Sequence, residues 1–121
     1  MRAFDRFFHL EPKYNRSYEI IDIFYDQLVY LSTHVLDASL NKLVSAAVYH
    51  LIETKKITIY RVENSNHSKR SFAFKESLIN GLESLSKEYD LPVGKLVNIA
   101  IYVALDEYSE YLNRVTYWRS E

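Results

Sequence analysis

The sequence predicts a mainly α-helical fold with a short two-stranded antiparallel β-ribbon, built from two tandem strand–helix–helix units packed as a pseudo-dimer. Three observations predict it. The chain has 121 residues, of which 48% are hydrophobic, so it can bury one core. Only Gly 2 and Pro 2 are present, too few for the many turns of a sandwich or barrel. A repeated pattern, described next, divides the chain into two similar halves.

Two blocks of sequence occur twice in the same order. Arg16-Ser17-Tyr18 recurs as Arg70-Ser71-Phe72, at an offset of 54 (70 − 16). Lys42-Leu43-Val44 recurs as Lys95-Leu96-Val97, at an offset of 53 (95 − 42). One residue has therefore been gained or lost between the blocks. We place the change around residues 31–37, because a turn tolerates a change of length.

Each half begins with a short predicted strand. Residues 17–21 and 71–75 alternate between apolar and polar side chains, which is typical of a half-buried strand. The apolar side chains predicted to face the core are Tyr18, Ile20, Phe72 and Phe74.

Two helices follow each strand. Apolar residues recur at helical spacing, first as Phe24, Leu28 and Leu31, then as Leu78, Leu82 and Leu85. A second helix begins after a polar connection in each half, where Ser39 is a good N-cap and Pro92 suits a first turn. In isolation, Asn80-Gly81 would suggest a hairpin turn. Its counterparts, residues 26–27, lie in a helical pattern, so we interpret both as helix.

The predicted organisation has five parts: an N-terminal extension (1–15), a first unit (16–53), a linker with a possible strand (54–69), a second unit (70–106) and a helical C-terminal extension (107–121). The possible strand is the alternating stretch 57–62. Aromatic residues near both ends offer surfaces for self-association: Phe4, Phe7, Phe8, Tyr117 and Trp118.

Composition excludes several classes of function. Lys+Arg 15 against Asp+Glu 16 gives a net charge of −1, which excludes binding DNA by bulk positive charge but not through a small local face. Cys 0 removes disulfides and thiolate chemistry, and the four histidines lack ligand spacing. We therefore expect no enzyme activity, no catalytic residues, no metal, no cofactor and no evident small-molecule ligand. Without an apolar stretch long enough for a bilayer, we expect an intracellular protein with no membrane partner.

The order of elements in the second half carries a resemblance. A strand with the inward pair Phe72 and Phe74, a helix, a turn, and a second helix opening on Gly94-Lys95-Leu96-Val97 resemble the ribbon-helix-helix family of transcription regulators. The second unit fits over residues 70–105 and the first, more loosely, over 16–51. The resemblance implies that the two strands form a ribbon that enters the major groove of double-stranded DNA at a promoter or operator. Two units in one chain are similar to a regulator from a virus of archaea, whose location would be the cytoplasm of the host cell.

The resemblance also implies which residues contact DNA. Alternate residues on the outer face of the ribbon would contact bases: Ser17, Glu19, Ile21, Ser71, Ala73 and Lys75. The residues before the strands, and those opening each second helix, would contact phosphates: Arg16, Lys69, Arg70, Ser39, Asn41, Lys42, Val93, Gly94 and Lys95. Glu19 and Ala73 stand at a central position where the family often has a basic or amide residue.

Two functions remain open at this point. The first is a sequence-specific DNA-binding transcription regulator. The second is a structural or protein-interaction module, such as an antitoxin-like or virion and DNA-coating protein, that retains the fold; the charge balance and Glu19 favour it. The two units can pair within one chain or between chains, and pairing between chains could extend self-association along DNA.

Overall fold

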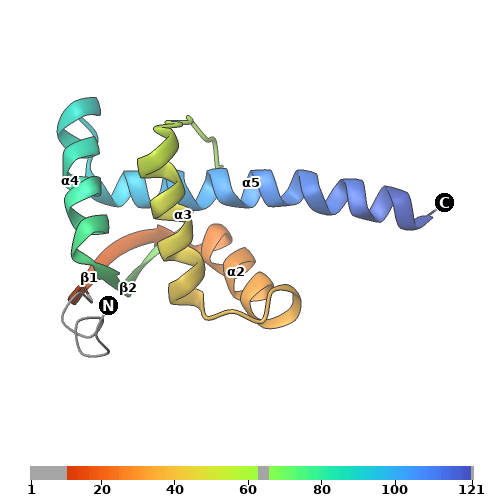
Figure 1. Cartoon of the computed structure of the whole chain (residues 1–121). Coiled ribbons are helices and arrows are strands. Elements are labelled where there is room, and N and C mark those ends of the chain that lie inside the picture. The colour runs from red at the N-terminus through yellow and green to blue at the C-terminus, as the bar shows by residue number, and fades with distance from the viewer. Residues whose placement is uncertain (1–10, 63–65, 121) are drawn as a thin grey trace, which may run out of the picture.

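The computed structural model describes residues 11–62 and 66–120, with side chains described up to residue 109. The described residues form two strands, four α-helices and a π-helical turn: β1 (Lys13–Ile21), α2 (Asp22–Tyr30), η1 (Leu31–Val35), α3 (Leu40–Thr54), β2 (His67–Lys75), α4 (Glu76–Tyr89) and α5 (Val93–Ser120) (Figure 1). The protein is thus mainly helical with a two-stranded sheet, as predicted. Phe4, Phe7 and Phe8 lie outside the described residues, and Tyr117 and Trp118 lie in the part of α5 whose side chains are not described.

β1 and β2 pair as an antiparallel ribbon centred on Ser17 and Ser71. These two serines are counterparts in the sequence repeat, so each strand extends equally far on both sides of them. Because the strands end directly before helices at residues 22 and 76, this register makes them begin at Lys13 and His67. Each strand is therefore four residues longer than predicted, and both begin in segments that we had assigned to an extension and a linker.

Residues 55–62 form neither a helix nor a strand, so the possible extra strand is not formed. Three of their side chains, Ile57, Tyr60 and Val62, pack against the core instead. The side chain of Ile59 between them is 91% exposed. The alternation that suggested a strand therefore reflects an irregular segment anchored at intervals to the helices.

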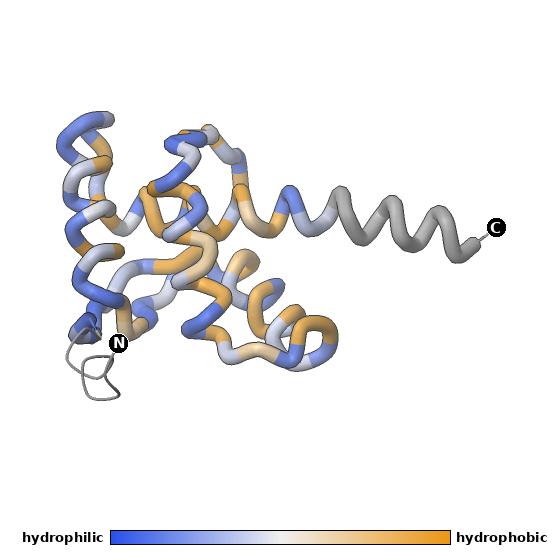
Figure 2. Tube along the Cα trace, viewed as in Figure 1, coloured by the Kyte–Doolittle hydropathy of each residue, from blue (hydrophilic) through white to orange (hydrophobic). Residues whose placement is uncertain are grey.

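The core lies between the inner face of the ribbon and the four helices. Ile20, Phe72 and Phe74 point inward from the strands and are at most 4% exposed. They meet buried residues of every α-helix, and Figure 2 shows hydrophobic segments facing one another where α3 crosses α5. Leu82, next to Gly81 within α4, is fully buried, which confirms that Asn80-Gly81 is helical. At Gly81, a Cβ atom would lie 2.6 Å from Ile52 Cδ1, so the glycine lets α3 approach α4 closely.

The extra residue of the first half is accommodated by a π-helical turn. η1 closes with a bond from the Leu36 N–H to the Leu31 carbonyl, 2.8 Å long and five residues apart. A serine hydroxyl donates a hydrogen bond to a carbonyl after the turn in both halves. Ser32 donates to the Ala38 carbonyl and its counterpart Ser86 donates to the Leu91 carbonyl, each at 2.5 Å. Four residues separate Ser32 from the left-handed Asp37, but three separate Ser86 from the left-handed Asp90. The predicted place of the length change is confirmed.

We expect deletion of Thr33, an exposed residue of η1, to be tolerated. The deletion makes the first half as long as the second, so an α-helical turn can replace the π turn. The free energy of unfolding should change by no more than about 1 kcal/mol in urea denaturation. Deletion of Tyr49, an exposed residue within α3, is the control: it rotates the following apolar positions by about 100° out of the core and should unfold the protein. Equal losses for the two deletions would contradict this account of η1.

Matching contacts tie each strand to the helix that follows the other strand. The first N–H of α2, on Asp22, donates to the Asn66 carbonyl at 2.9 Å, and that of α4, on Glu76, donates to the Pro12 carbonyl at 3.1 Å.

Ser39 caps α3 as predicted, since its hydroxyl accepts from the Lys42 N–H at 3.1 Å. No described helix is both long and apolar enough to cross a membrane.

Candidate nucleic-acid interface

The face of the ribbon that points away from the core is polar. We call it the outer face; its members are Lys13, Asn15, Ser17, Glu19, His67, Lys69, Ser71, Ala73 and Lys75. All of them are exposed except the half-buried Ala73. Ile21, which continues the same row, is only 8% exposed and joins the core. The ribbon therefore turns buried apolar side chains toward the helices and a polar face toward solvent.

Cross-strand pairs arrange this face in rows. At its centre, the Ser17 and Ser71 hydroxyl oxygens are 2.6 Å apart. At one end Lys13 lies directly opposite Lys75. Like charges in directly opposite positions oppose folding, so this pair does not serve stability. Toward the other end, Glu19 lies opposite Lys69, and its carboxylate is 2.9 Å from Nδ1 of His67. The positive charge is therefore concentrated at the Lys13–Lys75 end.

A groove of about 430 Å³ borders the ribbon beside β2 and the start of α3; we call it the β2-side groove. Lys13, Lys42 and Lys75 line it together with Glu11. Both carboxylate oxygens of Glu11 accept from Ser77, at 3.2 Å from its backbone N–H and 3.0 Å from its hydroxyl. In the described part of the chain, none of these three lysines has a carboxylate within 4.0 Å. The groove can therefore accept an anion.

A second groove, of about 500 Å³, borders the ribbon beside β1 and the start of α5; we call it the β1-side groove. Lys95 lines it, but so do Glu19 and His67. Tyr18 lies in the wall of this groove, and its pKa is raised mainly because the side chain is partly buried. The positive charge of Arg16 lowers this pKa and the negative charge of Glu83 raises it, but the net effect is a rise. The Tyr18 hydroxyl therefore stays protonated at neutral pH and can donate a hydrogen bond. This groove carries less positive charge than the β2-side groove.

The two second helices begin beside these grooves, with different N-termini. The first intrahelical bond of α5 runs from the Leu96 N–H to the Pro92 carbonyl, 3.2 Å. The preceding N–H groups, on Val93, Gly94 and Lys95, have no helical partner and can bind an anion. At Gly94 a Cβ atom would meet only Tyr18, at 4.0 Å, so packing does not require glycine there. In α3, the Ser39 cap already uses the N–H of Lys42.

The repeated arginines occupy different surroundings. Both stand on the inner side of the ribbon rather than on the outer face. Arg16 is exposed, donates to the Asn15 carbonyl at 3.0 Å and lies 5.6 Å from the Tyr14 ring centre. Arg70 is half-buried: its guanidinium carbon lies 3.9 Å from the Tyr25 ring centre, and Nη2 is 4.0 Å from the carboxylate of Asp22. Arg16 is the arginine with the freer reach toward a phosphate.

Two asparagines fix the outer edges of the ribbon to the second helices. Asn41 of α3 binds both backbone groups of Ala73, at 2.8 Å and 2.9 Å. Asn98 of α5 accepts from the Ile21 N–H at 3.0 Å and donates to the Glu19 carbonyl at 2.9 Å. Each second helix is therefore held to the strand of the opposite half. The side chain of Asn41, one of the predicted phosphate contacts, is occupied by this role.

Sequence reasoning missed three members of the outer face: Lys13, Asn15 and His67. It also placed Lys69 before the strand, whereas Lys69 lies within β2. The sequence repeat could have predicted these three residues. If two repeated strands form an antiparallel ribbon, the counterpart residues Ser17 and Ser71 can be expected to pair at its centre. Pairing Ser17 with Ser71 would have extended both strands and placed these side chains.

No family model, curated protein or solved structure matches the chain. The function is therefore argued from the geometry of the ribbon and its two grooves.

Proposed function

We propose that the protein is a transcription regulator that binds double-stranded DNA in a sequence-specific manner, with the outer face of the ribbon in the major groove. Ser17, Ser71, Asn15 and Lys75 would reach base edges, and the N-termini of α3 and α5 would approach the phosphates on either side. A two-stranded ribbon has the dimensions of this groove, and hydroxyl, amide and ammonium groups match its donors and acceptors.

One observation carries the proposal. Lys13, Lys42 and Lys75 converge on the β2-side groove, at the edge of a polar ribbon face, and among the described residues none of the three lies within 4.0 Å of a carboxylate. Glu11 is the acid in the same lining, so the groove has three positive charges against one negative charge. Lys13 and Lys75 lie directly opposite each other, an arrangement that is unfavourable unless an anion lies near both. A phosphate backbone beside the ribbon supplies that anion.

We further propose that the two halves form a tandem ribbon-helix-helix pseudo-dimer within one chain. The pairing of the counterparts Ser17 and Ser71 supports it, as do the matching bonds from Asp22 to Asn66 and from Glu76 to Pro12. In this arrangement the two-fold axis passes between the two serines. Pairing within the chain leaves self-association along DNA as a separate step.

The halves of the proposed interface differ in charge, so we propose that the DNA site is an imperfect palindrome. The half nearer the β2-side groove has Lys13, Lys42 and Lys75, whereas the other half has Glu19 and His67 beside Lys95. Phosphates should bind more tightly at the first half.

Selection from a pool of random duplexes, followed by fluorescence anisotropy at several salt concentrations, tests the proposal. The proposal predicts an enriched asymmetric site and an affinity that falls steeply with salt. Failure to enrich any sequence, with no binding to any duplex at low salt, would contradict it.

Replacing the acid on the outer face should strengthen DNA binding. In Glu19→Gln the side chain keeps its size but loses the charge that repels phosphates, so affinity at low salt should rise by about threefold to tenfold. Fluorescence anisotropy measures the change. Glu53→Gln is the matched control, because Glu53 is exposed in the last turn of α3, and it should leave the affinity unchanged. An unchanged or weaker affinity for Glu19→Gln would place this carboxylate away from DNA.

A structural or protein-interaction module is the second candidate, and the Glu19–His67 pair on the outer face favours it. Large hydrophobic side chains also stand exposed on the helices, including Ile23 (48%), Tyr30 (60%) and Tyr49 (58%). In this case the chain would show self-association or a protein partner. An interaction module without a DNA face would bind no duplex at low salt, and a DNA-coating protein would bind every duplex without enriching a sequence.

A further inference from the structure

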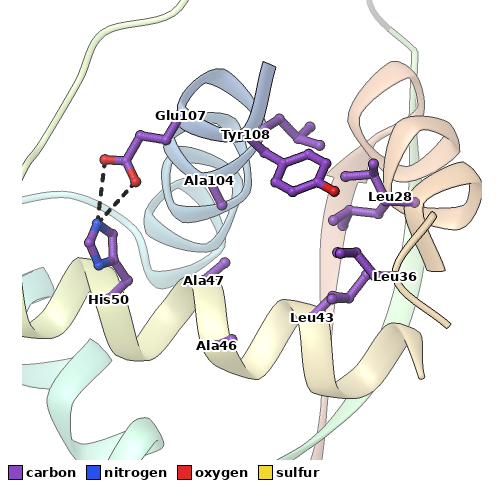
Figure 3. A pocket seen from close by; sticks show the side chains of 11 residues that line it. Leu28, Leu36, Leu43, Ala46, Ala47, His50, Ala104, Glu107 and Tyr108 are labelled. Carbon is purple, nitrogen blue, oxygen red and sulfur yellow. Dashed lines mark hydrogen bonds and ion pairs between the residues drawn. The ribbon is translucent and has the colours of Figure 1, made fainter. Parts of the chain in front are cut away.

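A cavity of about 340 Å³ lies between α2, α3 and α5, away from the outer face of the ribbon. Its walls are mostly apolar, with Leu28, Leu36 and Leu43 on one side and alanines of α3 and α5 on the other (Figure 3). We call it the alanine pocket. Its volume is near the lower end of the range for small-molecule sites, about 300–1,000 Å³.

The repeat allows a direct comparison with the other half of the same chain. By the offset of 53, Ala46 of the pocket corresponds to Ile99, and Ala104 corresponds to Leu51. Ile99 and Leu51 are 2% and 1% exposed, so at the two counterpart positions, one on α5 and one on α3, larger side chains are buried in the core. The alanine pocket is therefore the space that larger aliphatic side chains occupy in the counterpart.

The π-helical turn widens the same space. Leu31, the first residue of η1, lines the pocket and is only half-buried, whereas its counterpart Leu85 in α4 is 2% exposed. Leu36, just after η1, lines the pocket and is 41% exposed. The extra residue of the first half thus coincides with an opening that the second half lacks.

Polar groups are found at one end of the pocket. Nε2 of His50 lies 3.3 Å and 3.4 Å from the two carboxylate oxygens of Glu107 (Figure 3), and Nζ of Lys56 lies 3.6 Å from the same carboxylate. His50 takes the place of Val103, which is 4% exposed in the second half. A ligand in the pocket would therefore have an apolar body and one polar end.

We propose that the alanine pocket binds an aliphatic small molecule with a chain of about six carbons. Ala46 and Ala104 are each three carbons smaller than their counterparts Ile99 and Leu51, so together they leave space for about six carbons. The polar end of the ligand would lie at His50 and Glu107. Ala46 and Leu36 in the lining of the pocket are exposed, so the pocket is open to solvent, and an aliphatic ligand would bind by removing this apolar surface from water. The pocket shares no residue with the outer face, but Ala46 also lines the β2-side groove, so the test below measures 1-hexanol binding in the absence of DNA.

Titration of the full chain with 1-hexanol, followed by methyl NMR spectra, tests the proposal. We expect saturable shifts of the Ala46, Ala104 and Leu36 methyl signals, with a dissociation constant in the millimolar range, and a melting temperature that rises with 1-hexanol. The double variant Ala46→Ile/Ala104→Leu copies the filled half. It should melt higher than the unmodified protein and show no saturable shifts.

A second pair of variants keeps the test decisive if the filled variant does not fold. Leu36→Ser makes the mouth of the pocket polar and should weaken 1-hexanol binding at least threefold. Ile23→Ser, at a similarly exposed position outside the pocket, should leave the binding unchanged. The proposal is overturned if no saturable shifts occur, if they persist in the filled variant, or if Leu36→Ser leaves them unchanged. It is also overturned if sedimentation shows a dimer that the filled variant converts to a monomer, because the occupant is then a second copy.

Discussion

The double variant Lys13→Gln/Lys75→Gln is expected to lose DNA affinity by about tenfold to hundredfold at low salt. These two ammonium groups lie opposite each other on the outer face and line the β2-side groove with Lys42. If phosphates lie near both, the variant releases fewer counterions on binding. The slope of log affinity against log salt should therefore fall by about two, which fluorescence anisotropy with a fixed duplex measures.

Lys55→Gln/Lys87→Gln is the matched control. It removes the same total charge from the C-terminal cap of α3 (Lys55) and the last turn of α4 (Lys87), at the ends away from the ribbon. Lys55 pairs with Glu88 at 3.3 Å, but an exposed pair of this kind contributes little stability. The control should keep most of the affinity and most of the salt slope. Equal losses in both double variants would mean that only net charge matters, and would contradict binding through the outer face.

Asn98→Ala is expected to destabilise the protein by about 3 kcal/mol. Asn98 is the buried polar side chain that joins α5 to β1, and it is 5% exposed. Its amide accepts from the Ile21 N–H and donates to the Glu19 and Gly94 carbonyls, at 2.9–3.0 Å. Alanine removes this partner from the Ile21 N–H and the Glu19 carbonyl at a site that is only 5% exposed, whereas the Gly94 carbonyl keeps its helical bond within α5. The loss is a large part of the total stability of about 5–15 kcal/mol expected for a domain.

Asn80→Ala is the control for that variant, because Asn80 is exposed on α4. Its free energy of unfolding in urea should change by no more than about 0.5 kcal/mol. Asn98→Asp keeps the acceptor for the Ile21 N–H but turns a carboxylate oxygen toward two carbonyl oxygens, so it should also be destabilising. A stability of Asn98→Ala equal to that of Asn80→Ala would contradict a structural role for the buried amide.

Local features of the fold could be predicted from the sequence. The inward side chains Ile20, Phe72 and Phe74 and the Ser39 cap follow from patterns within a few residues, whereas the helical Asn80-Gly81 followed from its repeat counterparts. The place of the extra residue followed from comparing the two halves, because the change of offset limits it to one connection. These features depend on local spacing and on the repeat.

Features that depend on contacts between distant segments were missed. Beside Lys13 and Asn15 only Tyr14 alternates as a strand requires, because Arg16 stands at the next inward position. Pairing with β2, about sixty residues away, makes them part of a strand. Asn98 stands among apolar residues of α5, and its partners on β1 are 77 and 79 positions away. Neither pairing leaves a local pattern.

Identical motifs also acquired different surroundings. Arg16 and Arg70 belong to the same repeated tripeptide, but Arg70 is held against Tyr25, whose counterpart in α4 is the buried Ile79. The alanine pocket is a second case in which matching positions of the two halves differ in their surroundings. The sequence shows that Ala46 corresponds to Ile99, but only the packing of α2, η1, α3 and α5 shows that the space is left open.

The most direct measurement for the central claim is an amide NMR titration of the full chain with a random-sequence duplex at low salt. Non-specific binding with a dissociation constant of about 10⁻⁴–10⁻⁶ M suffices, so no operator needs to be known. We predict that the largest saturable shifts fall on Ser17, Ser71 and Lys75 of the ribbon and on Gly94 at the start of α5. Shifts confined to the ends of the helices away from the ribbon, at residues such as Tyr30 and Tyr89, or no shift with any duplex, would contradict the claim that the outer face binds DNA.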